Sequence, residues 1–198
     1  ELGFEEERTS KIVQEKLKEY GVDEIHTEIG KTGVVGIIRG NDGGGNRRIG
    51  LRADMDALPI QEDTGLSYAS KVDGKMHACG HDAHTTMLLG AAKYLAETRN
   101  FSGTAILIFQ PAEEGQGGAT KMLDDGLFKK FPCDEIYGIH NDPNGKNGEI
   151  GICKGKAMAG AAIFDINIDG IGSHAAMPHQ SKDPIIIAHE LITQLQSI

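Results

Sequence analysis

Short segments that favour β-strands alternate with segments that favour α-helices through most of this chain. Apolar or alternating runs predict strands at residues 24–28, 33–39, 48–53, 105–110 and 135–139. Apolar residues at helical spacing predict helices at residues 4–20, 82–98 and 118–125. This alternation predicts an α/β sandwich with a largely parallel sheet, in which an active site collects at the carboxyl ends of the strands.

Composition narrows the classes of protein to which the chain can belong. A formal net charge of -9 and the lack of a Lys/Arg cluster argue against a nucleic-acid partner. No apolar stretch approaches the ~20 residues that a membrane-spanning helix needs, so no membrane partner is expected. Three cysteines, Cys79, Cys133 and Cys153, form no disulfide framework and predict a cytoplasmic protein. The acidic run at residues 5–7 is interpreted as a solvated helix face.

The pattern changes character near residues 154–160, where we expect a domain boundary. Residues 162–169 alternate like a half-exposed strand, and residues 184–198 carry an apolar helical face. One strand and one helix bury too little surface to make a core of their own. We therefore expect one domain at 1–157, the beginning of a second at 158–198, and further residues before Glu1 and after Ile198.

Residues with metal-ligand side chains follow several of the predicted strands or begin a predicted helix. Cys79 and His81 lie in the motif HACGHDAH, and His140 follows the strand at 135–139. Thiolate and imidazole groups bind first-row metal ions, and ligands this dispersed are typical of catalytic sites rather than of small structural zinc modules. The alternatives are a buried thiol, a surface imidazole and a histidine that caps the end of a strand.

Two adjacent carboxylates, Glu113 and Glu114, follow the strand at 105–110. One interpretation is a helix N-terminus, where the helix dipole favours acidic residues. In the other interpretation, one carboxylate binds a metal ion and its neighbour acts as a general base. The position of the pair at the exit of an apolar strand favours the second interpretation.

Asp54 and Asp56 follow the strand at 48–53 and have three possible roles. They could bind a metal ion, orient a ligating histidine from behind, or form a turn, and we favour the orienting role. His174 and His179 lie in the second domain, where the simplest explanation is that they are solvent-exposed turn residues.

Five motifs, in this order and at this spacing, resemble one group of metal-dependent amidohydrolases. They are GLRADMDALP, MHACGHDAH, FQPAEEG, GIHNDP and GSHAAMPH, and together they cover nearly the whole chain. The group includes hippurate hydrolase, N-acetyl-diaminopimelate deacetylase and plant hydrolases of auxin–amino-acid conjugates, within the aminoacylase/carboxypeptidase superfamily. The resemblance implies a three-layer α/β/α metallopeptidase-like catalytic domain and an α+β lid or dimerisation domain.

The resemblance also implies roles for individual residues of the first domain. The expected ligands of two divalent metal ions, Zn²⁺, Mn²⁺, Co²⁺ or Ni²⁺, are Cys79, His81, Glu114 and His140. Glu113 is implied to be the general base. One further histidine ligand of the family lies near its C-terminus, and nothing in this chain matches it.

For the second domain the resemblance implies a lid that also pairs with a second copy of the chain. His174 is the first candidate for a lid histidine that acts on the substrate, and His179 is the second. Ser173 stands where the family usually has a glycine, which affects the local turn but leaves His174 in place. The predicted reaction is hydrolysis of the amide bond of a small N-acyl amino acid by a homodimeric enzyme.

Two other functions are compatible with the sequence. Cys79 could be the nucleophile of a thiol amidase, with His81 or His84 as its base, although this leaves the two glutamates and His140 without a role. The chain could instead be a metal-binding or dimerising fragment without activity.

Overall fold

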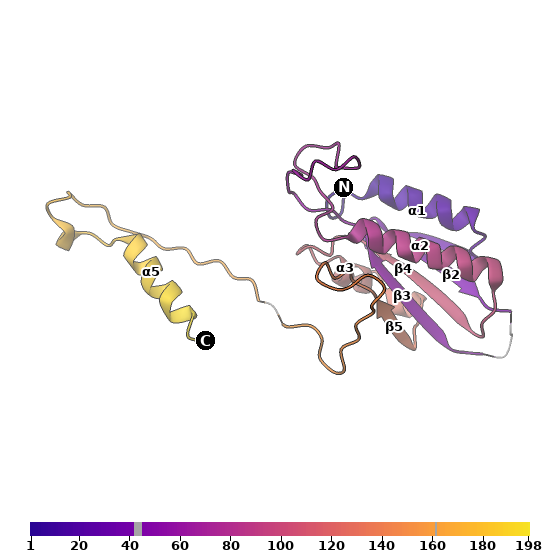
Figure 1. Ribbon diagram of the computed structural model, residues 1–198. Helices are drawn as coiled ribbons and strands as arrows, with labels where there is room; N and C mark the ends of the chain where they lie inside the picture. The colour runs from indigo at the N-terminus through magenta and orange to yellow at the C-terminus, as the bar shows by residue number, and fades with distance from the viewer. Residues whose placement is uncertain (42–44, 161) are drawn as a thin grey trace. The chain divides into compact units, whose positions relative to one another are not determined.

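The computed structural model describes residues 1–41, 45–160 and 162–198, and it divides into two compact units. The first unit is Glu1–Gly145 and the second is Lys146–Ile198 (Figure 1). The division falls earlier in the chain than the boundary expected after residue 157.

The first unit is built on a five-stranded sheet in the order β1-β2-β4-β3-β5. Its strands are β1 (Glu24–Ile29), β2 (Gly33–Arg39), β3 (Arg48–Asp54), β4 (Thr104–Gln110) and β5 (Glu135–Gly138). The pairs β1–β2 and β2–β4 are antiparallel, whereas β3 pairs in parallel with both β4 and β5. The sheet is therefore mixed, and the expectation of a largely parallel sheet is wrong. Only residues 30–32 join β1 to β2, and so short a connection permits antiparallel pairing alone.

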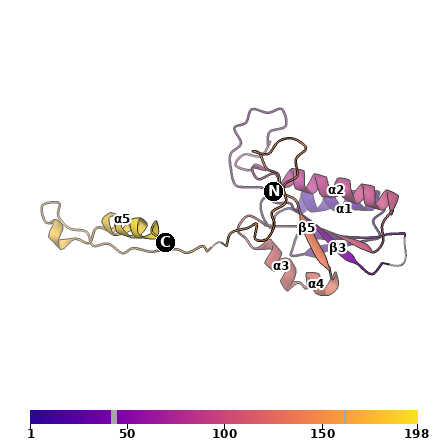
Figure 2. The ribbon, with the colours of Figure 1, turned by 60° about the horizontal axis from the view of Figure 1, so that its bottom comes forward.

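Helices cover both faces of this sheet (Figure 2). On one face lie α1 (Glu7–Glu19) and α2 (His81–Thr98), and on the other lie α3 (Gly118–Asp124) and α4 (Leu127–Lys130). Alternate residues of β2 point to opposite cores: Val34 and Ile38 pack with residues of α1 and α2, whereas Val35 and Ile37 pack with residues of α3 and α4. The predicted three-layer α/β/α architecture is confirmed.

The acidic run at residues 5–7 is not a uniformly solvated face. Helix α1 begins at Glu7, and Glu6 occupies its N-cap position with a fully buried side chain. Glu5 and Glu7 on either side are exposed. The expectation is therefore wrong for Glu6, because tertiary contacts described below enclose its carboxylate.

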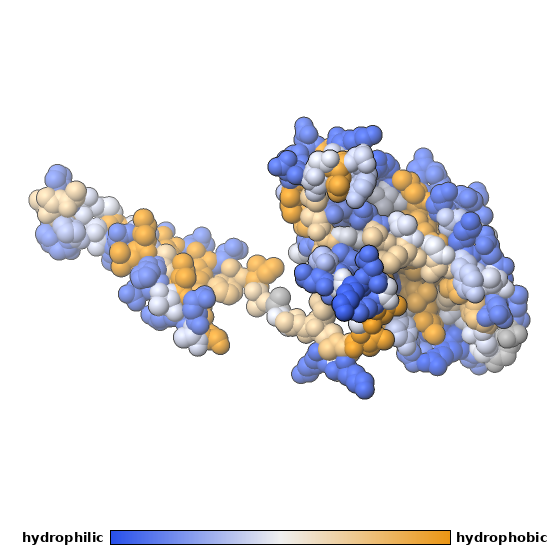
Figure 3. All heavy atoms as spheres, viewed as in Figure 1, coloured by the Kyte–Doolittle hydropathy of each residue, from blue (hydrophilic) through white to orange (hydrophobic). Residues whose placement is uncertain are grey.

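The second unit contains a short 3-10 helix at Pro178–Gln180 and helix α5 at Pro184–Leu195. The helix predicted at residues 184–198 is thus present, and the Asp183 carboxylate caps it by accepting the Ile185 N–H at 2.9 Å. Figure 3 shows apolar side chains on the surface of this unit, where the isoleucines of α5 are exposed. In the described part of the chain, no helix has the length and apolar composition that crossing a bilayer would require.

The strand expected at residues 162–169 is wrong. These residues form no regular element, and the only strand-like pairing in the described part of the second unit is an isolated bridge between Ile171 and Lys182. An alternating sequence makes a strand only when a neighbouring segment pairs with its backbone, and this segment has no such partner within the described residues.

Arg99, the C-cap residue of α2, connects the carboxyl end of this helix to the segment before β1 and to the last residue of β2. Its guanidinium donates to the Asp23 carboxylate at 2.8 Å, to the Arg39 carbonyl oxygen at 3.0 Å and to the Gly21 carbonyl oxygen at 2.8 Å. Asp23 also accepts the Arg39 N–H at 2.7 Å. Partial burial alone would raise the pKa of Asp23, but the hydrogen bonds from Arg99 and Arg39 outweigh it and hold the pKa below its ordinary value.

We expect Asp23→Asn to lower the free energy of unfolding by about 1–2 kcal/mol at neutral pH, because the charged acceptor of Arg99 is lost. The folded-state pKa of Asp23 lies below its unfolded value, so this stabilisation is present above the unfolded pKa and is lost as the pH falls through the folded-state pKa. Melting curves followed by circular dichroism should therefore differ near neutral pH and converge in acid. A melting-temperature difference that stays constant into acid would contradict this account.

Candidate active site

The carboxyl ends of three strands bring candidate residues to one edge of the sheet. Because β3 pairs in parallel with β4 and β5, these three strands end side by side. Asp54 is the last residue of β3, and Asp56 follows it. Glu113 and Glu114 follow β4, and His140 follows β5.

The amino end of α2 brings Cys79 and His81 to the same edge. The helix begins at His81, and Gly80 before it has a left-handed backbone with φ 84°. A Cβ atom at position 80 would lie 2.2 Å from the side-chain oxygen of Asn141, in the loop after β5. Glycine is required here both for its conformation and for this close approach, which places Cys79 beside His140.

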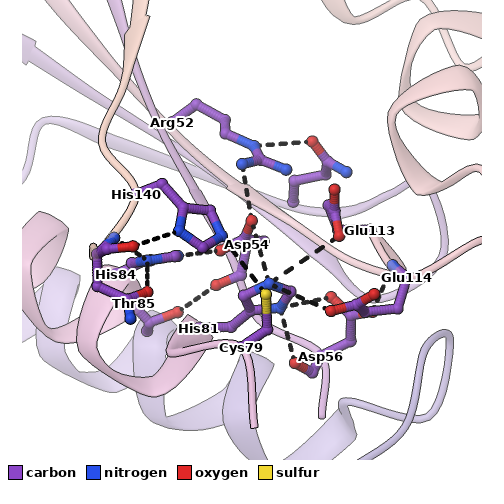
Figure 4. A network of polar contacts seen from close by, with 12 residues as sticks. Arg52, Asp54, Asp56, Cys79, His81, His84, Thr85, Glu113, Glu114 and His140 are labelled. Atoms are coloured by element: carbon purple, nitrogen blue, oxygen red, sulfur yellow. Dashed lines mark hydrogen bonds and ion pairs between the residues drawn. The ribbon is translucent and has the colours of Figure 1, made fainter. Parts of the chain in front are cut away.

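The candidate ligands converge on the His81 ring (Figure 4). The Cys79 Sγ atom lies 3.4 Å from His140 Nε2, although the two residues are 61 positions apart. His81 Nε2 lies 3.8 Å from Glu114 Oε1 and 4.0 Å from Glu113 Oε2. Two groups have ligand atoms that all lie within 4.8 Å of one another, namely Cys79 with His81 and His140, and His81 with Glu113 and Glu114. The structure thus brings together all five residues that the sequence predicts for the centre.

The environment of the His81 side chain is suited to binding a cation. Its side chain is 1% exposed, and its Nε2 atom is buried without a hydrogen-bond partner. Such a buried, unpaired nitrogen is costly unless something binds it. A thiol, two imidazoles and a carboxylate surround this point, a donor set that suits zinc and the other later first-row metals.

Asp56 holds His81 in the orientation that directs Nε2 toward the cluster. His81 Nδ1 lies 2.9 Å from the Asp56 carbonyl oxygen and 3.2 Å from its Oδ1 atom. Burial alone would raise the pKa of Asp56, but hydrogen bonds from His81 and from the N–H groups of Glu114 and Glu113 hold it below the ordinary value. Burial would likewise lower the pKa of His81, and the contact with Asp56 raises it instead. An ionised Asp56 therefore fixes the His81 tautomer with Nε2 free to bind metal.

Asp54 is also buried and is held by other residues. Its Oδ1 atom lies 2.7 Å from His84 Nδ1, and its Oδ2 atom lies 2.7 Å from the Arg52 guanidinium and 3.6 Å from His81 Nε2. The ligand atoms of Asp54, His81 and His84 also lie within 4.8 Å of one another. The ion pair with Arg52 favours a supporting role for Asp54 over direct coordination.

His84 and Asn141 belong to the site, although the sequence did not single them out as part of the metal centre. His84 is 1% exposed, and its Nε2 atom accepts the Asn141 N–H at 3.1 Å. Asn141 in turn follows His140, whose Nδ1 lies 2.8 Å from the Asn141 carbonyl oxygen. His84 therefore fixes the loop that carries His140. The sequence feature that indicates this role is the spacing of three residues between His81 and His84, which places both rings on one face of a helix.

His174 and His179 lie in the second unit, and both are exposed. His174 Nδ1 accepts the Ala176 N–H at 3.1 Å, and His179 belongs to the 3-10 helix. These local contacts do not establish an action on substrate, so both roles stay predictions.

The chain is similar to a family of hydrolases over most of its length. The model of peptidase family M20/M25/M40 matches residues 50–197. Hippurate hydrolase of Campylobacter jejuni subsp. jejuni is 54% identical over 198 residues, which are 100% of this chain and 51% of that protein. N-acetyl-L-cysteine deacetylase of Bacillus subtilis is 48% identical over 100% of this chain and 47% of that protein. The chain thus spans about half the length of the curated relatives it matches.

Two solved structures are also similar to this chain in fold and in sequence. A putative aminohydrolase from methicillin-resistant Staphylococcus aureus has a TM-score of 0.76 and 35% identity, covering 100% of this chain and 52% of that chain. The YXEP protein of Bacillus subtilis, a dinuclear metal-binding peptidase of the M20 family, has a TM-score of 0.67 and 46% identity over 73% of this chain and 40% of that chain. The residues matched by the family model include every candidate residue of the site. The resemblance predicted from the five motifs is confirmed, and the chain belongs to peptidase family M20/M25/M40.

Proposed function

We propose that this chain carries the catalytic centre of a metal-dependent amidohydrolase that cleaves the amide bond of N-acyl amino acids. One observation supports this above all: Glu113 lies beside a buried histidine whose free Nε2 faces a thiol and a second carboxylate. Relatives named for hydrolysis of hippurate and for deacetylation of N-acetylcysteine support the same substrate class.

The residues that would hold two divalent ions are Cys79, His81, Glu114 and His140. When bound, the ions would supply Lewis-acid activation of water and of the substrate carbonyl. The candidate ions are Zn²⁺, Mn²⁺, Co²⁺ and Ni²⁺, and a thiolate among the ligands favours the later transition metals over Mg²⁺.

The two glutamates differ in ways that support separate roles. The Glu114 N–H is fixed by Asp56 at 3.0 Å, and its side chain is 29% exposed. The Glu113 side chain is 42% exposed and is therefore the more accessible of the two to solvent. Glu113 can therefore take a proton from the attacking water and return it to the leaving amine, while Glu114 stays with the ligands.

We assign the second unit to substrate closure and dimerisation. His174, with His179 as the second candidate, would donate a hydrogen bond to the oxyanion that develops on the substrate. Helix α5 exposes Ile185, Ile186 and Ile192, an apolar surface suited to pairing with a second copy. A cytoplasmic location and the lack of nucleic-acid and membrane partners are part of the same proposal.

The thiol amidase alternative is less consistent with the site. Burial and the adjacent Glu114 carboxylate raise the pKa of the Cys79 thiol to about 11. A nucleophilic cysteine needs the opposite shift, toward a thiolate at neutral pH. A thiol in this environment would instead release its proton to solvent when a cation binds the sulfur atom.

Glu113→Gln in the full-length protein should lower kcat for an N-acyl amino acid by about 10²–10⁴-fold, because the general base is lost. Metal content, measured by mass spectrometry of the purified protein, should stay nearly unchanged because no ligand is lost. Glu114→Gln is the matched control and should lose metal. If Glu113→Gln lost metal in proportion to activity, the two glutamates would have exchanged roles.

Removal of metal with a chelator should abolish hydrolysis, and added Zn²⁺ or Mn²⁺ should restore it, because the proposed reaction needs the ions. Cys79→Ser should shift the metal titration to higher concentrations by about 10-fold or more, because a thiolate ligand is replaced by a hydroxyl. Activity that survives chelation but is lost on thiol alkylation would support the thiol amidase instead.

His174→Ala should lower kcat by about 10-fold or more while KM changes little, because the proposed contact forms mainly in the transition state. His179→Ala serves as the matched control, with both constants close to wild type. Steady-state kinetics with the reverse result would assign the role to His179.

A further inference from the structure

The first residues of the chain lie against the loop that follows β3. The Ala57 N–H donates to the carbonyl oxygen of Glu1 at 2.8 Å, and Leu2 forms an isolated parallel bridge with Ala57. Ala57 directly follows Asp56. Figures 1 and 2 both show the N-terminus beside the amino end of α2.

The same segment contacts the loop that follows β4. A Cβ atom on Gly3 would lie 3.0 Å from the Ala112 Cβ atom, so the two backbones approach closely. Ala112 directly precedes Glu113. Residues 1–6 therefore contact both the loop that carries Asp56 and the loop that carries Glu113. These residues lie outside the range matched by the family model, which begins at residue 50.

Glu6 makes the central contact of this segment. Its side chain is fully buried, with one carboxylate oxygen accepting the Ala112 N–H at 2.8 Å and the other accepting the Thr32 hydroxyl at 2.5 Å. No Lys, Arg or His ion pair involving Glu6 occurs among the described residues. A buried carboxylate is costly, and here its stabilisation comes from directed hydrogen bonds and from its place at the amino end of α1.

Ala112 has a backbone conformation that needs such support. Its φ of 48° lies in the left-handed region, which a residue with a Cβ atom rarely adopts. The turn at Ala112 directs the chain so that the Glu114 N–H reaches Asp56 at 3.0 Å. The Ala112 carbonyl oxygen accepts the Gly118 N–H at 2.9 Å and closes the loop. Unfavourable backbone conformations persist only where surrounding contacts enforce them.

We propose that Glu6 is a positioning residue for Glu113. Its carboxylate fixes the N–H of the left-handed Ala112 and thereby sets the direction in which the next residue presents its side chain to the site. This inference rests on the proposed role of Glu113 as the general base. A misplacement of about 1 Å at a reacting group can lower a rate by about 100-fold, so the support of this turn matters for turnover.

Three variants separate positioning from general stability. Glu6→Ala removes the acceptor for Ala112. Glu6→Gln keeps it, because the amide oxygen can accept the Ala112 N–H while the amide nitrogen donates to Thr32. Thr32→Val removes the other hydrogen bond of Glu6 and leaves the Ala112 contact in place.

In the full-length protein, Glu6→Ala should lower kcat by about 10- to 100-fold with KM and metal content nearly unchanged. Glu6→Gln should stay within about threefold of wild type, and Thr32→Val should lower the melting temperature without changing kcat. Wild-type kcat in folded Glu6→Ala would overturn the proposal, as would an equal loss in Glu6→Gln. If Glu6→Ala does not fold, Glu6→Asp, whose shorter side chain withdraws from Ala112, is judged by the same criteria.

A second measurement does not depend on activity. In the metal-free protein, amide exchange followed by NMR should be at least about 10-fold faster at Ala112 in Glu6→Ala than in wild type or Thr32→Val. Equal exchange in all three would overturn the positioning contact. If the wild-type protein hydrolysed no N-acyl amino acid, the proposed function would fail, while the exchange data would still decide whether Glu6 fixes the turn.

Discussion

The parallel pairing of β3 with both β4 and β5 is the constraint on which the site depends. Neighbouring parallel strands end at the same edge of a sheet, so the loops that follow β3, β4 and β5 lie together although they are distant in sequence. Helix α2 then packs against β3, and its amino end meets the loop after β5 through the close approach of Gly80 and Asn141. Side chains as far apart as Cys79 and His140 thereby become neighbours.

Around this cluster lies a set of buried polar groups that are satisfied by one another. Asp56 contacts His81 and the Glu114 N–H, and Asp54 contacts His84 and the Arg52 guanidinium. Buried charges are tolerated only when they are paired and hydrogen-bonded, so each contact both stabilises the fold and restricts the candidate ligands. His81 Nε2 is a buried atom of this cluster that has no hydrogen-bond partner, and it lies at the position where a cation would bind.

Much of this arrangement could be predicted from sequence. Strand and helix positions followed from apolar periodicity, and the candidate ligands followed from the residues at strand ends and from the five motifs. The segment at residues 162–169 could not be assigned in this way, because a strand exists only with a paired neighbour. Glu6 was misjudged for a related reason: in sequence it resembles its exposed neighbours, and only the folded chain encloses it.

The sequence by itself determined which chemical groups the site contains and the local elements that carry them, since both follow from side-chain type and short-range spacing. Only the tertiary structure decided which of these groups meet, which hydrogen bonds orient them, and how the sheet is ordered. The antiparallel pairing of β2 with β4, the hydrogen bond of His84 to the loop that carries His140, and the contact of Glu6 with Ala112 all join residues that are distant in sequence and share no local pattern. Such contacts depend on the complete packing of the chain, because burial and hydrogen bonding across distant segments are settled together.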